Sequence, residues 1–263
     1  MATIAFITAR GTEPAVGGVY PLDGANSFYL DKITEFRKAG GDIIMSFGGA
    51  AGAEMGNVVQ EIATLVKIYQ EVINIYSLKY IDLDIEGSLI ADTAAVDRRN
   101  QALKIIKKNN PSLNISYTLP TNPTGLDNNG EYVLASAAKY AFQFDVLNLM
   151  QMDYSVPTTP GQMAAFAIQS AKAGKAQLEK YGLKATIGCC PMIGVNDTPG
   201  EVFSLDDAKT LVAFANKNTW ISRLAFWSLG RDQNPSGNTA VSASSVSSGV
   251  IQDPFAFTKI FNA

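Results

Sequence analysis

Three carboxylic acids stand at alternate positions of one short segment, Asp82-Leu83-Asp84-Ile85-Glu86. The residues between them are apolar, as expected of a buried β-strand, and alternation with a period of two sends the three acids to one face of that strand. Acids this close repel each other and lose solvation when they are buried, so a purely structural strand would avoid them. We expect the segment to perform acid chemistry or to bind a cation.

Glu86 lies at the end of this expected strand and is followed by Gly87, which lets the chain turn away. The charges of Asp82 and Asp84 should raise the pKa of Glu86, which predicts a protonated side chain that can act as a general acid. Two alternatives stay open on the strand alone. One is a calcium or magnesium site, and the other is a hydrogen-bonded trio of acids that shares protons and only stabilises the fold.

Histidine is absent from the chain. This absence excludes Ser-His-Asp triads, Cys-His dyads and metal sites that rely on imidazole. General acid or base work must therefore fall to Asp, Glu, Tyr, Lys or Cys. The only cysteines, Cys189 and Cys190, are adjacent; we expect them to be small apolar residues of a buried strand, with a strained vicinal disulfide as the alternative.

The composition favours one soluble domain over residues 1–263. The net charge is −3 and no Lys/Arg cluster is present, which argues against nucleic acid or an anionic membrane as the main partner. No apolar stretch approaches the roughly 20 residues that span a bilayer, and no secretory leader begins the chain. The partner class left open is a neutral, polar small molecule or polymer.

Short apolar runs rich in β-branched and aromatic residues alternate with longer amphipathic segments, which is typical of βα units around a parallel sheet. Each expected helix is followed by a strand, except the last, as in a TIM-type (β/α)8 barrel. The expected strands are Thr3–Thr8, Asp42–Phe47, Tyr80–Glu86, Asn114–Leu119, Asp145–Met152, Ala185–Cys190 and Arg223–Leu229. The expected helices are Ser27–Ala39, Asn57–Leu78, Thr93–Lys108, Tyr132–Phe142, Gly161–Tyr181, Leu205–Lys217 and Pro254–Phe261. We interpret the Ser/Gly-rich segment Asn234–Gly249 as a long loop on the barrel's active face.

The acidic strand resembles the signature of the family 18 glycoside hydrolases, the chitinases and their relatives, which reads Asp-x-x-Asp-x-Asp-x-Glu. Its last three acids match Asp82, Asp84 and Glu86, whereas Lys79 stands where the family has the first acid. That outer position lies farthest from the reaction centre in the family.

Three further family motifs occur in the family's order at expected strand ends. They are Ser46-Phe47-Gly48-Gly49, Met152-Asp153-Tyr154 and Phe226-Trp227-Ser228. The segments Pro191–Asp197 and Gly200–Phe203 also look like compact bacterial chitinases that lack an inserted α+β domain. Trp227 matches the tryptophan that floors the reactive sugar site, and Phe6 matches an aromatic residue that lines the reactive subsite, with simple core filling as the alternative for both.

This resemblance implies hydrolysis of β-1,4 linkages between N-acetylglucosamine units, with the substrate's own 2-acetamido oxygen as nucleophile. Glu86 would be the acid and base, Asp84 would hold the acetamido N–H, Asp82 would share its proton and charge, and Tyr154 would donate to the acetamido carbonyl. Substrate binding would fall to Trp227, Met152, Asp153, Phe6, Ser46, Gly48 and Gly49. The resemblance implies no metal and no cofactor.

The same resemblance implies a monomer that acts outside the cell on chitin or N-acetylglucosamine oligomers. Two alternatives stay open: an endo-β-N-acetylglucosaminidase that acts on glycoprotein glycans or peptidoglycan, and a carbohydrate-binding protein without activity on the same fold. Relatives of the second kind typically lose the acid that corresponds to Glu86, which is present here.

Counted from the family's motifs, Thr3–Thr8 matches the second barrel strand and Arg223–Leu229 the eighth. Seven βα units are therefore visible, and the first strand has no counterpart in the sequence. We expect Thr3–Thr8 and Arg223–Leu229 to lack a continuous hydrogen-bonded ladder, with an upstream segment as the expected cause and a seven-stranded protein as the alternative.

Overall fold

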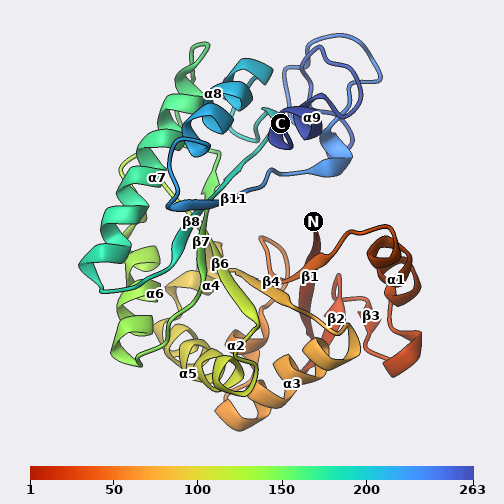
Figure 1. The fold of residues 1–263 in the computed structure, drawn as a ribbon, viewed down its shortest axis with the longest axis vertical. Helices are drawn as coiled ribbons and strands as arrows, with labels where there is room; N and C mark the ends of the chain where they lie inside the picture. The colour runs from red at the N-terminus through yellow and green to blue at the C-terminus, as the bar shows by residue number, and fades with distance from the viewer. The chain divides into compact units, whose positions relative to one another are not determined.

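The expected alternation of strands and helices appears in the computed structural model, which describes residues 1–263 (Figure 1). The chain forms two units that interleave in sequence. Unit 1 contains Met1–Leu119, Asn128–Asp145 and Tyr181–Ala185, and unit 2 contains Pro120–Asp127, Val146–Lys180 and Thr186–Ala263. A single catalytic domain over 1–263 stays a prediction.

Unit 1 contains four parallel strands in the order β6-β5-β4-β1: β1 (Ala2–Arg10), β4 (Ile43–Gly48), β5 (Tyr80–Asp84) and β6 (Asn114–Pro120), the last ending one residue into unit 2. Two short antiparallel strands follow β1, namely β2 (Glu13–Val16) and β3 (Tyr20–Pro21). Within this unit β4 pairs with Ala2–Ala5 and, after a register shift, with Ile7, whereas β2 pairs with Ile7–Arg10 on the other side. The sequence did not predict this hairpin, which covers the second half of the strand expected at Thr3–Thr8.

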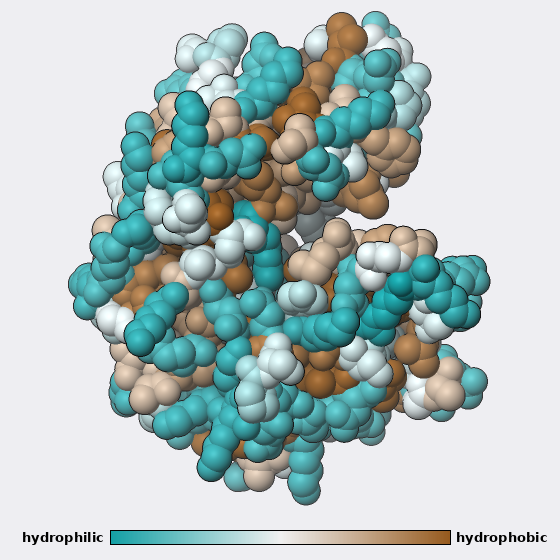
Figure 2. Space-filling model, viewed as in Figure 1, coloured by the Kyte–Doolittle hydropathy of each residue, from teal (hydrophilic) through white to brown (hydrophobic).

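Six helices belong to unit 1: α1 (Leu30–Lys38), α2 (Met55–Val58), α3 (Ile62–Ile75), α4 (Gly87–Ala91), α5 (Thr93–Asn109) and α6 (Asn128–Lys139). The buried side chains of α3 recur at the spacing of one helix face, at Leu65, Ile68, Tyr69, Val72 and Ile73. Figure 2 shows hydrophilic side chains over the outside of α3 and α5. The single helix expected at Asn57–Leu78 was wrong, because an extended backbone at Val59 and Glu61 separates α2 from α3.

Unit 2 contains three parallel strands in the order β11-β8-β7: β7 (Val146–Gln151), β8 (Thr186–Pro191) and β11 (Ile221–Leu224). Its helices are α7 (Gln162–Lys180), α8 (Leu205–Ala215) and α9 (Ala256–Phe261), and β9 (Gly194–Val195) pairs with β10 (Val202–Phe203). A Cβ atom at Gly174 of α7 would lie 3.0 Å from the Leu149 side chain, so this helix packs closely on β7. Ser204 and Asp207 form a capping box that starts α8.

The last strand differs from the expected Arg223–Leu229, since β11 starts at Ile221 and ends at Leu224. Backbone hydrogen bonds to the β8 segment nevertheless continue, from Ala225 N to Cys189 O (2.8 Å) and from Trp227 N to Pro191 O (2.9 Å). Trp227 therefore lies beside the carboxyl end of β8.

The segment Asn234–Gly249 contains no helix and no regular strand. It packs on the residues that follow β8, because Val195 N donates to Ser248 O (2.7 Å) and the buried Arg231 donates to the carbonyls of Ser244 and Ile193. The expected loop at the carboxyl end of the unit's parallel strands is confirmed.

Both cysteines are free thiols, so the vicinal disulfide is not formed. Burial raises the pKa of Cys189 to about 12, as expected of a small apolar residue inside a sheet. None of the helices combines the length and the apolar character that a membrane span requires.

Candidate active site

Ile81 and Leu83 of the acidic strand β5, and Ile85 just beyond its end, are completely buried, which confirms the predicted alternation. On the other face, Asp82 is also buried and lies in register with Ser46 of β4 and Ser116 of β6. Side chains at matching registers of parallel strands point to the same face, so the three form a row across the sheet. This row places hydroxyl groups on both sides of the carboxylate.

Asp82 accepts hydrogen bonds from three hydroxyl groups. Ser46 Oγ donates to Oδ2 (2.8 Å), Ser116 Oγ donates to Oδ1 (2.5 Å), and Thr118 Oγ1 lies 2.9 Å from both oxygens. Hydrogen bonds from hydroxyl groups to a carboxylate favour its charged form and offset part of the cost of burying it.

Asp84 lies one step further along the same face and is only 7% exposed. Burial raises the pKa of this carboxyl group well above its ordinary value, and the carboxylates of Glu86 and Asp82 raise it further. Its buried Oδ1 atom has no hydrogen-bond partner. Charge crowding, which the sequence predicts to raise the pKa of Glu86, acts together with burial on the pKa of Asp84 in the structure.

Glu86 lies two residues beyond β5, where its extended backbone precedes helix α4. Ile85 N donates to Thr118 O (3.1 Å), so backbone pairing with β6 continues up to this point. Gly87 has φ +56°, in the left-handed region, which confirms the predicted turn. Glu86 is half-buried and therefore has access to solvent beside two buried acids.

Gly48 and Gly49 fit where a side chain would not. A Cβ atom at Gly48 would lie 2.0 Å from the Asp84 carbonyl oxygen, and one at Gly49 would lie 2.5 Å from the Phe6 ring. Gly49 N also donates to Asp84 O (2.9 Å). The two glycines thus let the loop after β4 approach the backbone of β5 and the aromatic side chain of β1.

Unit 1 therefore brings together seven of the residues that the sequence selected: Phe6, Ser46, Gly48, Gly49, Asp82, Asp84 and Glu86. The other four, Met152, Asp153, Tyr154 and Trp227, belong to unit 2.

Tyr154 lies in the loop that follows β7 and is 8% exposed. Its ring meets Phe166 of α7 edge-on, with 5.3 Å between the centroids, and its hydroxyl oxygen has no hydrogen-bond partner. Burial raises the pKa of this phenol, so the hydroxyl keeps its proton and can donate it to a ligand oxygen. The preceding Asp153 is half-buried, and its Oδ1 accepts a hydrogen bond from Thr198 N (2.7 Å).

Trp227 is 42% exposed, although it follows a strand of the core. Its backbone is fixed on both sides by the β8 segment, through Trp227 N to Pro191 O and Ile193 N to Trp227 O (both 2.9 Å). An indole on a fixed backbone offers an apolar face to a ligand at a low entropy cost. Core filling, the alternative considered for this residue, does not fit its exposure.

Sequence reasoning missed a buried ion pair beneath the Gly48-Gly49 loop. Glu54 accepts from Arg99 Nε and Gly56 N (both 2.7 Å) and from Tyr69 OH (2.5 Å), and both charged side chains are fully buried. One signal was available: Arg99 stands three or four residues from Ala95, Val96, Ala102 and Leu103, on the apolar face of its helix. A charged residue on such a face indicates a buried partner.

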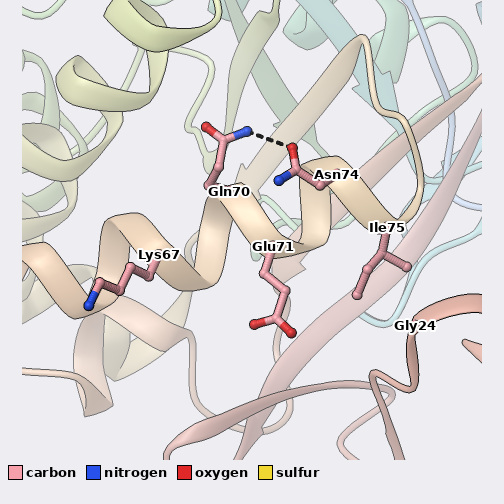
Figure 3. Close-up of a pocket in the computed structure, with 6 residues that line it drawn as sticks. All are labelled: Gly24, Lys67, Gln70, Glu71, Asn74 and Ile75. Atoms are coloured by element: carbon pink, nitrogen blue, oxygen red, sulfur yellow. Dashed lines mark hydrogen bonds between the residues drawn. The ribbon is translucent and has the colours of Figure 1, made fainter.

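No group of three or more Cys, Asp and Glu side chains is arranged to hold a metal ion. The calcium or magnesium alternative therefore has no ligand set in the structure. A pocket of about 410 Å³ opens on the exposed side of α3 and is lined by Gly24, Lys67, Gln70, Glu71, Asn74 and Ile75 (Figure 3). None of the candidate residues lines this pocket.

No protein-family model matches the sequence. The chain is 32% identical over 248 residues to Endochitinase 11 of Metarhizium anisopliae, a match that covers 88% of this chain and 47% of the relative. It is also 32% identical over 251 residues to a probable bifunctional chitinase/lysozyme of Escherichia coli (strain K12), covering 88% of this chain and 28% of the relative. The chain thus spans about half, or less than a third, of the length of these curated relatives.

A solved structure of similar size is the catalytic domain of the hyperthermophilic chitinase from Pyrococcus furiosus. It is 32% identical, with a TM-score of 0.86 over 99% of this chain and 84% of that domain. Catalytic-site mutants of that chitinase's active domain 2, complexed with chito-oligosaccharides, match with the same TM-score at 31% identity. This likeness confirms the predicted α/β fold of the TIM-barrel type.

Proposed function

Since the chain belongs to the family 18 glycoside hydrolases, we propose that it hydrolyses the β-1,4 linkages of chitin and of N-acetylglucosamine oligomers, with retained configuration. The observation that carries the proposal is the acid face of β5. It combines a buried Asp82 that accepts hydrogen bonds from three hydroxyls, an Asp84 with a raised pKa and an unpartnered oxygen, and a half-buried Glu86 just beyond them.

Glu86 is the proposed general acid, which protonates the glycosidic oxygen and then takes a proton from the incoming water. The nucleophile is the 2-acetamido oxygen of the substrate, so no second enzyme carboxylate attacks the sugar. Asp84 is proposed to hold the acetamido N–H and to stabilise the cyclic intermediate. Its unpartnered Oδ1 supports this role, because a substrate N–H would satisfy that buried atom. Asp82 shares the proton and the charge of Asp84.

Tyr154 is proposed to donate its hydroxyl to the acetamido carbonyl, which fixes the angle of attack. Its unpartnered, protonated hydroxyl supports this role. Trp227 is proposed to stack on a sugar ring, and Phe6, Met152 and Asp153 to line the substrate. We assign Ser46, Gly48 and Gly49 to the same site through the acids whose positions they fix.

Chitin is insoluble and large, so we propose an extracellular site of action. We also propose that the catalytic unit acts as a monomer. The chito-oligosaccharides bound by the Pyrococcus chitinase support an oligomer of N-acetylglucosamine as the ligand.

The test compares fully acetylated chitin oligomers with glucosamine oligomers of equal length. Because the acetamido group supplies the nucleophile, we expect cleavage of the acetylated substrate only, measured as products by mass spectrometry. Glu86→Gln is the control that attributes cleavage to this chain, with an expected loss of about 10²- to 10⁴-fold. Rapid cleavage of the glucosamine oligomer, or an active Glu86→Gln variant, would overturn the proposed mechanism.

A second candidate is the hydrolysis of peptidoglycan, since one relative is named a chitinase/lysozyme. Peptidoglycan also contains N-acetylglucosamine in β-1,4 linkage, so the same acids would serve both substrates. Parallel product assays on chitin hexamer and on purified peptidoglycan decide between them. Release of peptidoglycan fragments without cleavage of the hexamer would favour this second candidate.

A further inference from the structure

The loop that carries Tyr154 has an unfavourable backbone. Asp153 has φ +52° and Ser155 has φ +65°, both in the left-handed region that side chains other than glycine rarely adopt. Such conformations cost free energy and persist only where surrounding contacts determine them. Tyr154 stands between the two, and its ring packs edge-on against Phe166. The position of its hydroxyl therefore depends on the loop backbone as well as on this ring contact.

Glu201 fixes this backbone. One carboxylate oxygen accepts Tyr154 N (3.0 Å) and the other accepts Val156 N (3.1 Å), so the carboxylate bridges both sides of Ser155. Glu201 is fully buried, and its described hydrogen-bond partners are backbone N–H groups of this loop. Hydrogen bonds to a carboxylate are about twice as strong as those between neutral groups.

The segment that presents Glu201 is itself fixed. Asn196 N donates to Glu201 O (3.0 Å), Glu201 N donates to Thr198 O (3.2 Å), and the next residue begins the short strand β10. The loop also binds back to this segment, because Thr198 N donates to Asp153 Oδ1 (2.7 Å). The two segments thus exchange carboxylate-to-backbone hydrogen bonds in both directions.

We propose that Glu201 is a positioning residue for the reaction, which clamps the loop backbone so that the Tyr154 hydroxyl points at the substrate acetamido carbonyl. This inference rests on the role proposed above for Tyr154. Glu201 itself does not touch the substrate in this scheme. Burial raises the pKa of Glu201, while the loop N–H groups oppose that effect, which is consistent with a carboxylate that depends on these donors.

The test is a double-mutant cycle with Glu201→Gln, Tyr154→Phe and the double variant. An amide presents an NH₂ group to one of the two loop N–H donors, so the clamp opens. We expect kcat on chitin hexamer to fall by about 10- to 100-fold in Glu201→Gln. A displacement of a reacting group by about 1 Å can reduce the rate by up to about 100-fold. If Glu201 acts through Tyr154, the double variant is no slower than Tyr154→Phe alone. Losses that multiply in the double variant would overturn the proposal.

The matched control is Glu179→Gln, the same substitution at an exposed position on α7 of the same unit, which should leave kcat unchanged. Should Glu201→Gln fail to fold, Glu201→Asp enters the cycle in its place. Its shorter carboxylate reaches fewer loop N–H groups and should lose less activity. An Asp variant whose loss multiplies with that of Tyr154→Phe would also contradict the clamp.

A second measurement does not depend on hydrolysis. Nitration by tetranitromethane followed by peptide mass mapping should leave Tyr154 unmodified in the wild type and modify it in Glu201→Gln. The exposed Tyr29 and the buried Tyr69 serve as internal references. Tyr154 that stays protected in Glu201→Gln would overturn the clamp. The proposed function would instead be contradicted by an unchanged kcat in Tyr154→Phe or by a wild type that cleaves no hexamer. The labelling result would then decide by itself whether Glu201 holds the Tyr154 loop.

Discussion

At the scale of single residues, hydroxyl groups on the strands beside β5 offset the cost of burying Asp82. Asp82, Asp84 and Glu86 were found from alternation alone, because acids on an apolar strand are costly and therefore informative. Thr118 and Ser116 carry the same kind of signal, since they alternate with buried apolar residues on β6, but their target becomes clear only from the strand register. Glu201 carries no local signal for its role, as its partner loop lies 45 to 47 positions away along the chain.

Thr118→Val should reduce both stability and activity, because valine keeps the shape of threonine and removes the hydroxyl that contacts both oxygens of Asp82. Loss of a hydrogen bond to a charged group costs about 1.5–3 kcal/mol. We expect the free energy of unfolding, measured by urea denaturation, to fall by that amount, and kcat to be several-fold lower. Thr34→Val, on an exposed face of α1, is the control. Equal stability of the two variants would show that the Thr118 hydroxyl does not support the acid.

Secondary-structure elements were predicted best where tertiary context matters least. The seven parallel strands follow from apolar β-branched runs, and most of their bounds agree within two residues. The pairs β2–β3 and β9–β10 were missed, since strands of two to four residues depend on pairing partners rather than on composition. The break between α2 and α3 was missed because Val59 and Glu61 take an extended backbone within a segment whose apolar spacing is otherwise helical.

Gly48→Ala tests how closely β4 and its loop approach β5. A methyl group there would overlap the Asp84 carbonyl oxygen, at a position with φ +107°. We expect a loss of about 3 kcal/mol in unfolding free energy together with nearly complete loss of activity.

The control for that substitution is Gly40→Ala, at φ +87° with open space around the added methyl group. It isolates the backbone strain, which costs about 1 kcal/mol. A Gly48→Ala variant no less stable than Gly40→Ala would mean that the two backbones can separate without cost.

At the scale of the whole molecule, the fold class followed from the order of motifs and from the repeated βα pattern. The division into two interleaved units did not, because it reflects contacts between residues far apart in sequence. The missing histidines have a consequence at this scale too. No side chain has an ordinary pKa between 5 and 7, so stability changes in this range must come from groups with perturbed pKa values.

Asp84 is such a group, because its pKa is raised in the folded protein. Its folded-state pKa is raised above the unfolded value, so the folded protein binds more protons and its stability falls as pH rises above about 4. Asp84→Asn removes this contribution. We expect its melting temperature to exceed that of the wild type by an amount that grows from pH 5 to pH 7, measured by calorimetry. A gap that shrinks with pH would contradict a raised pKa at Asp84.

The hydroxyl row across β4, β5 and β6 also bears on enzyme engineering. Because Asp82 accepts hydrogen bonds from both neighbouring strands, the segment Asp82–Glu86 cannot be transferred to another protein by itself. A graft of Asp82–Glu86 into another parallel sheet would bring the acids without the hydroxyl donors that offset the cost of burying Asp82. The smallest transferable part is three strands wide, with hydroxyl residues at the two matching registers.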